Sequence, residues 1–175
     1  MLLESCGSYH NRAVVSAPHM AELLTERLVL RPTDPTYTDF IARLQAREGV
    51  DQFLGRLGAR DERDVLFTVV REGVKVGQVG LVKSDALDGE DFELVCALLP
   101  EAEGCGIATE ACAALTDWAF TAKPWPRIIA CINNHNKPAL ELARRLELAH
   151  LQARAHGDET VFVRNRPAAL PSEEL

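Results

Sequence analysis

One segment, Glu103–Thr109, limits the folds that this chain can adopt. It reads EGCGIAT and stands between an apolar run, FELVCALL at residues 92–99, and a stretch with apolar residues at helical spacing over residues 107–118. Glycine permits unusual backbone angles and close approach of a ligand. The first N–H groups of a helix favour an anion. The segment therefore predicts a strand, a glycine loop and a helix whose start can hold a diphosphate; the alternative is a loop that only turns the chain into a helix.

Two familiar phosphate-binding folds do not match this loop. The segment lacks the GxxxxGK[ST] pattern of a nucleoside-triphosphate loop. It also lies in the middle of the chain, after a predicted antiparallel hairpin, and does not open a series of βαβ units. The elements on either side of the loop must therefore indicate which fold it belongs to.

The rest of the chain predicts strands and helices in one mixed order. Valine-rich runs on either side of Arg71-Glu72-Gly73 indicate a hairpin, and Asn136 is a good residue to cap a helix. The predicted strands are at residues 27–30, 65–70, 74–82, 92–99, 128–132 and 161–163, and the predicted helices begin near Thr38, Ile107 and Asn136.

Length and composition predict one domain with a single buried core. The chain has 175 residues, of which 47% are hydrophobic. We expect a flexible extension at residues 1–21, the domain at residues 22–166 and a disordered tail at residues 167–175. The apolar runs are too short for a membrane span, and the N-terminus lacks a secretory pattern, so we expect a cytoplasmic protein.

Cysteine content and charge limit the disulfides, metals and binding partners that we expect for this chain. Five cysteines without a CxxC pair suggest neither a disulfide framework nor a zinc site, and we expect no metal. The net charge of −7 comes without a basic stripe. It argues against nucleic acid as a partner and fits a cationic one such as an amine.

The glycine loop and its flanks carry a resemblance to a known family. Gly106-Ile107-Ala108 matches the end of the pattern (R/Q)xxGx(G/A), and the order strand, loop, helix, strand, Asn-capped helix resembles the acyl-CoA-binding core of the GNAT superfamily. LLTERLVLRP at residues 23–32, ATEA at 108–111 and NKPA at 136–139 are similar to the branch that includes ribosomal-protein N-terminal acetyltransferases.

The resemblance implies a fold and a co-substrate. The fold is α/β (α+β): a central mixed, mostly antiparallel sheet flanked by helices, in a single domain. The co-substrate is acetyl-CoA or a related acyl-CoA. By this resemblance the backbone N–H groups near Ala97 and Leu98 polarise the acyl carbonyl, where their strand splays from residues 128–132 around a bulge. The implied acyl-CoA-binding residues are Ala97, Leu98, Gly104, Cys105, Gly106, Ile107, Ala108, Thr109 and Asn136.

Glu93 is the candidate base. It lies on the predicted strand before the loop, where the family has a glutamate, and a partly buried carboxylate can have a raised pKa and accept a proton. The alternative is a solvated strand glutamate. Asn136 also has two interpretations, because capping a helix would by itself explain it.

Several positions depart from the family pattern. Glu103 stands where arginine or glutamine is usual, Ala139 where serine is usual, and Glu147 where glycine is usual. The family's acid is a tyrosine beyond the Asn-capped helix, but the two tyrosines here are Tyr9 and Tyr37. The acid is therefore unassigned; His135 is a candidate that a solvated loop position would equally explain.

The prediction is an N-acetyltransferase that transfers an acetyl or other acyl group from acetyl-CoA to a primary amine by direct attack. The amine is a small molecule or a protein N-terminus, and a homodimer is possible. One alternative is a catalytically degenerate CoA-binding or protein-interaction module with the same fold. Another is an α/β interaction domain that binds no CoA.

Overall fold

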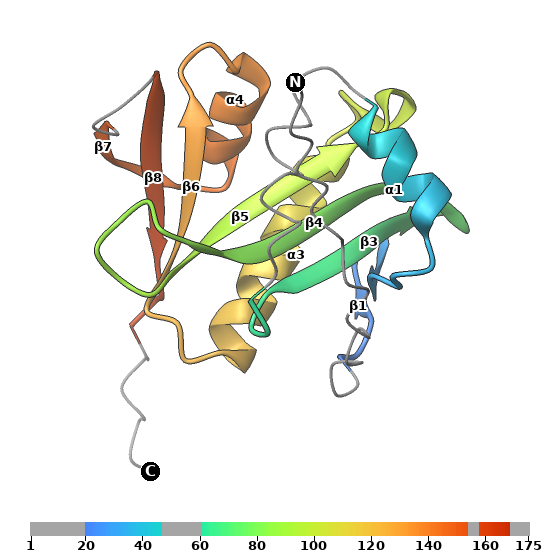
Figure 1. Cartoon of the computed structure of the whole chain (residues 1–175), viewed down its shortest axis with the longest axis horizontal. Coiled ribbons are helices and arrows are strands. Elements are labelled where there is room, and N and C mark those ends of the chain that lie inside the picture. The colour runs from blue at the N-terminus through green and yellow to red at the C-terminus, as the bar shows by residue number, and fades with distance from the viewer. Residues whose placement is uncertain (1–19, 47–60, 154–157, 169–175) are drawn as a thin grey trace, which may run out of the picture.

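The computed structural model describes residues 20–46, 61–153 and 158–168. Within them one eight-stranded sheet has the order β1-β2-β3-β4-β5-β6-β8-β7, with helices on its faces (Figure 1). Neighbouring strands are antiparallel except β5 and β6, which are parallel. The predicted mixed, mostly antiparallel sheet is confirmed. Most of the predicted extension (1–21) and tail (167–175) lies outside the described residues.

The N-terminal half builds one end of the sheet. Strand β2 (Val29–Pro32) replaces the strand predicted at residues 27–30: it begins later and includes Pro32, and the shorter β1 (Leu23–Leu24) before it had no prediction. Proline is tolerated there because β1 ends its pairing at Leu30, so no strand on that side needs an N–H from residue 32. The elements are β1 (Leu23–Leu24), β2 (Val29–Pro32), α1 (Thr38–Gln45), β3 (Val65–Arg71) and β4 (Val74–Ser84).

The β3–β4 hairpin follows its prediction closely. Arg71 pairs with Val74, so Glu72 and Gly73 form a two-residue turn with φ of 51° and 79°. Two successive positive φ values match the twist of the flanking strands. Glycine supplies the second value without strain, and Glu72 adopts the first as a non-glycine residue.

The C-terminal half contains the glycine loop and the strands around it. Short β7 had no prediction, because its sequence alternates weakly and it pairs only with β8. The helices of the described residues are too short to span a bilayer. The elements are β5 (Asp91–Leu98), the 3-10 turn η2 (Pro100–Ala102), α3 (Ile107–Ala122), β6 (Arg127–Asn133), α4 (Lys137–Arg145), β7 (Ala149–Ala153) and β8 (Glu159–Asn165).

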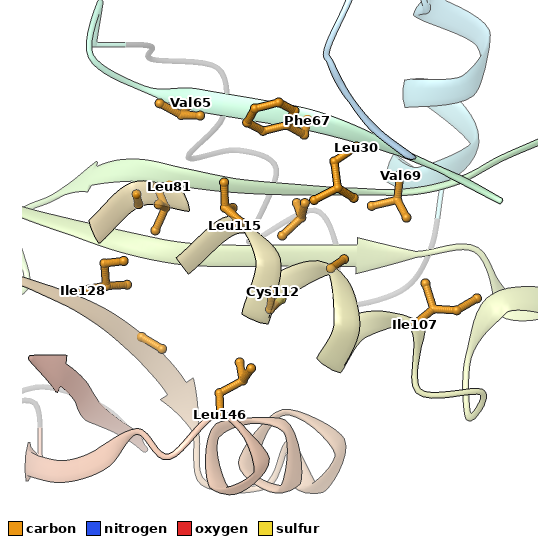
Figure 2. Packing of buried hydrophobic residues seen from close by; sticks show 14 of the residues in the cluster. Leu30, Val65, Phe67, Val69, Leu81, Ile107, Cys112, Leu115, Ile128 and Leu146 are labelled. Carbon is orange, nitrogen blue, oxygen red and sulfur yellow. The ribbon is translucent and has the colours of Figure 1, made fainter. Parts of the chain in front are cut away.

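The main core lies between the sheet and α3. Figure 2 shows Phe67, Leu81 and Leu115 meeting there from β3, β4 and α3, and each is fully buried. Burying side chains of this size stabilises a fold by about 1.5–3 kcal/mol each. Because side chains alternate along a strand, the residues between them on β3, β4 and β5 face the other side of the sheet, toward α1.

Candidate functional site

The parallel strands β5 and β6 separate almost at once. Among the described residues they pair at one position, Glu93 with Ile129, whereas β6 pairs with β8 along its whole length. Figure 1 shows β5 and β6 diverging. The β4–β5 register runs from Ser84–Asp91 to Gly77–Leu98 without a shift, so the opening needs no bulge between these strands.

A half-buried ion pair holds the closed end of the fork. Arg127, at the start of β6, donates to both carboxylate oxygens of Asp91, at the start of β5, at 2.6 and 2.8 Å. Asp91 is only 3% exposed. The hydrogen bonds to this carboxylate raise the pKa of Arg127 above its ordinary value. Such a bidentate pair fixes geometry as well as charge.

The open end of the fork is a cleft of about 760 Å³. Its walls come from β5, the glycine loop, α3, β6 and α4. All the predicted acyl-CoA-binding residues line it except Cys105. They are Ala97, Leu98, Gly104, Gly106, Ile107, Ala108, Thr109 and Asn136.

The glycine loop presents the start of α3 to this cleft. Gly104 and Gly106 both have positive φ, 72° and 78°, which explains why glycine is needed at each. Gly106 is the N-cap of α3, and no described side chain caps the helix. The first N–H that bonds back into the chain is that of Glu110, to Gly106 O. The positive end of the helix dipole therefore faces the cleft.

Strand alternation also directs the backbone of β5. Leu99 N–H donates to Val76 O, so Ala97, two residues before it, also turns its N–H toward β4. The N–H groups of Cys96 and Leu98 point the other way, toward the opening. Of the two positions predicted to polarise the acyl carbonyl, Ala97 and Leu98, Leu98 is the one whose N–H points toward the opening.

Two charged residues of the cleft were not predicted. Arg145 and Glu141 line it from α4, and Arg145 Nε donates to Glu141 at 2.9 Å. Hydrogen bonds from Arg144 and Arg145 lower the pKa of Glu141 to about 2. In the sequence, the adjacent Arg144 and Arg145 at the end of the Asn-capped helix were the feature from which a charged group here could have been predicted. Glu103, on the rim, also lines the cleft and is exposed.

Glu93 lies at the fork but not in the cleft wall. Its side chain is 2% exposed, and Ser84 Oγ donates to Oε2 at 3.1 Å. Alternation places it on the face opposite α3, so it is not the solvated strand residue of the alternative interpretation. This face carries a row of buried polar side chains along β3, β4 and β5: Thr68, Gln78, Ser84, Asp91 and Glu93.

The remaining candidates have ordinary structural roles. Asn136 Oδ1 accepts from Ala139 N–H at 3.2 Å, which confirms the predicted cap of α4. His135 is outside the cleft wall, 82% exposed, with Nε2 3.6 Å from Asp158. Tyr37 packs at α1 under the Lys75 ammonium, 3.9 Å from its ring centre, and Tyr9 lies outside the described residues. No tyrosine of the described residues lines the cleft.

Metal chemistry has no obvious centre in the described part of the chain. No three His, Cys, Asp or Glu residues there are grouped to hold an ion. The cleft instead combines backbone donors and small residues with one arginine, Arg145, and two carboxylates, Glu103 and Glu141. Its length and the helix start at its rim suit a long ligand that carries an anionic group.

Comparison with known proteins agrees with this geometry. Residues 17–149 match the model of the acetyltransferase (GNAT) domain family. No curated protein matches the sequence significantly. A protein of Bordetella pertussis described as a GnaT-family acetyltransferase is 25% identical, with a TM-score of 0.69 over 83% of this chain and 99% of that one.

Two more distant structures share the fold. The ribosomal-protein-S5-alanine acetyltransferase of Vibrio fischeri is 15% identical, with a TM-score of 0.65 over 87% of this chain and all of that one. RimL, a ribosomal L7/L12 alpha-N-protein acetyltransferase in complex with coenzyme A through a CoA–cysteine disulfide, is 13% identical, with a TM-score of 0.66 over 83% and 98% of the two chains.

Proposed function

Because this chain belongs to the acetyltransferase (GNAT) domain family, we propose that it is an N-acetyltransferase that moves an acetyl group from acetyl-CoA to a primary amine by direct attack. Acyl transfer is the general chemistry of the family. The identity of the donor, the acceptor and the direct mechanism are the parts that we propose.

The observation that carries the proposal is the cleft between β5 and β6, with the start of α3 at its rim. The backbone of residues 104–109 would hold the CoA diphosphate, because helix N–H groups and the helix dipole both favour an anion. The pantetheine arm would run down the cleft between the separating strands. The thioester would then lie near the fork, next to Leu98 and Cys96.

In the proposed reaction, the amine nitrogen attacks the thioester carbonyl carbon. A backbone N–H of β5 stabilises the negative charge that develops on the carbonyl oxygen. The C–S bond breaks, and the CoA thiolate leaves with the electron pair. Glu93 accepts the amine proton, directly or through water, and Ser84 orients its carboxylate.

The acceptor would approach from the face of the sheet that carries α1. Glu93 and the buried polar row lie on that face, while the CoA cleft opens on the α3 side. We propose an amine on a small molecule or a protein N-terminus, and the net charge of −7 favours a cationic one. Proteins with this fold include enzymes described as acting on ribosomal proteins. Cytoplasmic action and a homodimer remain predictions.

A second candidate is a CoA-binding module without catalysis. It is favoured by Glu93 lying outside the cleft wall and by the lack of a cleft-lining tyrosine among the described residues. In this case the loop would bind CoA, but no group would be placed to move the proton.

Thermal unfolding with acetyl-CoA and with desulfo-CoA tests the proposal first. A ligand at 100 times its dissociation constant stabilises the fold by about 2.7 kcal/mol, or roughly 5–10 °C here. We expect a saturable shift with both ligands. Lack of a shift at millimolar ligand would refute CoA binding.

Glu93→Gln then separates enzyme from module. With an acceptor found by screening amines, we expect kcat to fall about 10²–10⁴-fold while the CoA-induced shift is retained. Glu90→Gln, a change at an exposed carboxylate nearby, is the matched control. Equal turnover by wild type and Glu93→Gln would exclude Glu93 as the base.

A further inference from the structure

Arg27, on the turn between β1 and β2, reaches the back of the glycine loop. Its Nη1 donates to the carbonyl oxygen of Cys105 at 3.0 Å, and its Nε donates to Glu110 Oε2 at 2.7 Å. These partners are 78 and 83 residues away in sequence. The arginine thus joins the N-terminal hairpin to both the loop and the first turn of α3.

Glu110 is tied to the same hairpin by further bonds. Its Oε1 accepts from Thr25 Oγ1 at 2.5 Å and from Arg27 N–H at 2.9 Å. Burial would raise the pKa of this carboxyl, but the hydrogen bonds from Thr25 and Arg27 outweigh burial and lower it. Glu110 is therefore a charged anchor, and Arg27 neutralises a carboxylate that would otherwise oppose an anion at the helix start.

The bond to Cys105 sets the direction of a peptide plane. In a trans peptide the carbonyl oxygen and the following N–H point in opposite directions, and the described peptides are all trans. Arg27 holds the Cys105 oxygen on the outer side of the loop, where neither Cys105 nor Arg27 lines the cleft. The N–H of Gly106 consequently points away from Arg27, and Gly106 itself lines the cleft.

The guanidinium also lies directly against the loop. A Cβ added to Gly106 would stand 3.4 Å from Arg27 Nη2. Gly104 and Gly106 have no side chains that could fix the shape of the loop, and both have positive φ. Within the loop Cys105 Sγ donates to the Glu103 carbonyl oxygen at 3.4 Å, and Arg27 adds a support from outside it.

We propose that Arg27 is a positioning residue for the diphosphate of CoA: by binding the Cys105 carbonyl and Glu110, it aims the Gly106 N–H into the cleft. This inference rests on the proposed function, and extends it by giving the hairpin a role in binding the co-substrate. It also offers a reason why the loop tolerates Glu103, since part of its geometry is fixed from behind.

The chain provides a matched control for the test. Arg31 on the same hairpin pairs with Glu22 at 2.8 Å, and both side chains are 49% exposed. This pair does not touch the loop. Arg27→Met and Arg31→Met each remove one guanidinium while keeping an unbranched side chain, so they separate the loop contact from a general loss of surface charge.

NMR titrations with CoA and with pantetheine, the arm that lacks the diphosphate, provide the measurement. We expect Arg27→Met to weaken CoA about tenfold and to change the affinity for pantetheine less than about twofold. Arg31→Met should change neither. In the wild type the Gly106 amide signal should move on adding CoA but not pantetheine, a result that needs no variant to fold.

The outcomes separate this inference from the proposed function. If wild type binds CoA but Arg27→Met binds it equally well, or loses CoA and pantetheine to the same extent, the positioning role is wrong. A Gly106 amide unaffected by bound CoA would also overturn it. If wild type does not bind CoA, the proposed function itself fails, and this inference fails with it.

Discussion

Glu103 puts a carboxylate on the rim of the cleft, beside the backbone groups that would bind the diphosphate. It is exposed, and its φ of −76° is extended backbone, so its position does not require any special residue type. Its charge is therefore the feature that matters for binding. Like charges at the surface repel weakly and are screened by salt.

Glu103→Gln should bind CoA about two- to fivefold more tightly at low salt, because one repulsive charge is removed. The gain should shrink in 0.5 M NaCl. Isothermal titration checks this, with Glu101→Gln as control: Glu101 pairs with Arg43 and does not line the cleft. Weaker binding by Glu103→Gln would show that this side chain supports the loop.

At the scale of elements, the ends of α4 explain two features of the sequence. Its start is capped by Asn136, and its end is followed by Glu147 in the left-handed region, with φ of 57°. Leu148 N–H then bonds to Ala143 O, which closes the helix in the manner of a glycine-terminated one. The left-handed φ at this position explains why the family usually has glycine there, and it makes the glutamate strained.

Glu147→Gly should raise the free energy of unfolding by about 0.5–1 kcal/mol, because glycine adopts this φ without a Cβ penalty. Urea unfolding measures the change. Ala46→Gly is the control, since Ala46 ends α1 with an ordinary φ of −65° and should gain nothing. A loss of stability in Glu147→Gly would show that the strain is offset by contacts of the glutamate.

Asn136→Ala should lower stability by about 1 kcal/mol, because the Ala139 N–H loses its acceptor. Asn136→Asp retains an acceptor and should unfold like the wild type. Thermal unfolding of both variants without ligand tests the cap, and repeating it with CoA tests pantetheine binding. If both variants lose stability equally, the side-chain amide has a role other than capping.

For the whole molecule, hydrogen-bonded carboxylates on several elements share one response to acid. Hydrogen bonds lower the pKa of Asp34, Asp61 and Glu141, and in Glu110 they outweigh the opposing effect of burial. The ordinary values are 3.8 for aspartate and 4.5 for glutamate. Because the folded values lie below these, the stability that they contribute is present above pH 4.5 and is lost as the pH falls through the folded values.

The melting temperature should therefore be nearly constant from about pH 6 to 8 and fall steadily below about pH 4.5. Differential scanning calorimetry from pH 7 to pH 2.5 measures it. In Arg27→Met the part of this fall that comes from Glu110 should be smaller, since its carboxylate loses the guanidinium donor Arg27 Nε and keeps only the backbone N–H of residue 27 and Thr25 Oγ1. A maximum of stability below pH 4 would contradict this account.

The sequence by itself determined most of the elements and the family. Valine-rich runs, the Glu72–Gly73 turn, the Asn136 cap and the glycine loop are decided by residues close together in the chain, so they could be predicted locally. The loop also placed most of the predicted acyl-CoA-binding residues on one strand, one loop and one helix start. Because this strand, loop and helix start follow one another in the chain, their residues could be expected to line one cleft, and they do.

Only the tertiary structure decided which distant residues meet. The Asp91–Arg127 pair, the contacts of Arg27 with Cys105 and Glu110, and the presence of Arg145 in the cleft join residues separated by many positions. Periodicity reports which residues share a face but not which elements pack together. The side of the sheet reached by Glu93 was fixed in the same way: strand alternation gives two faces, and only the packed helices show that α3 covers the other one.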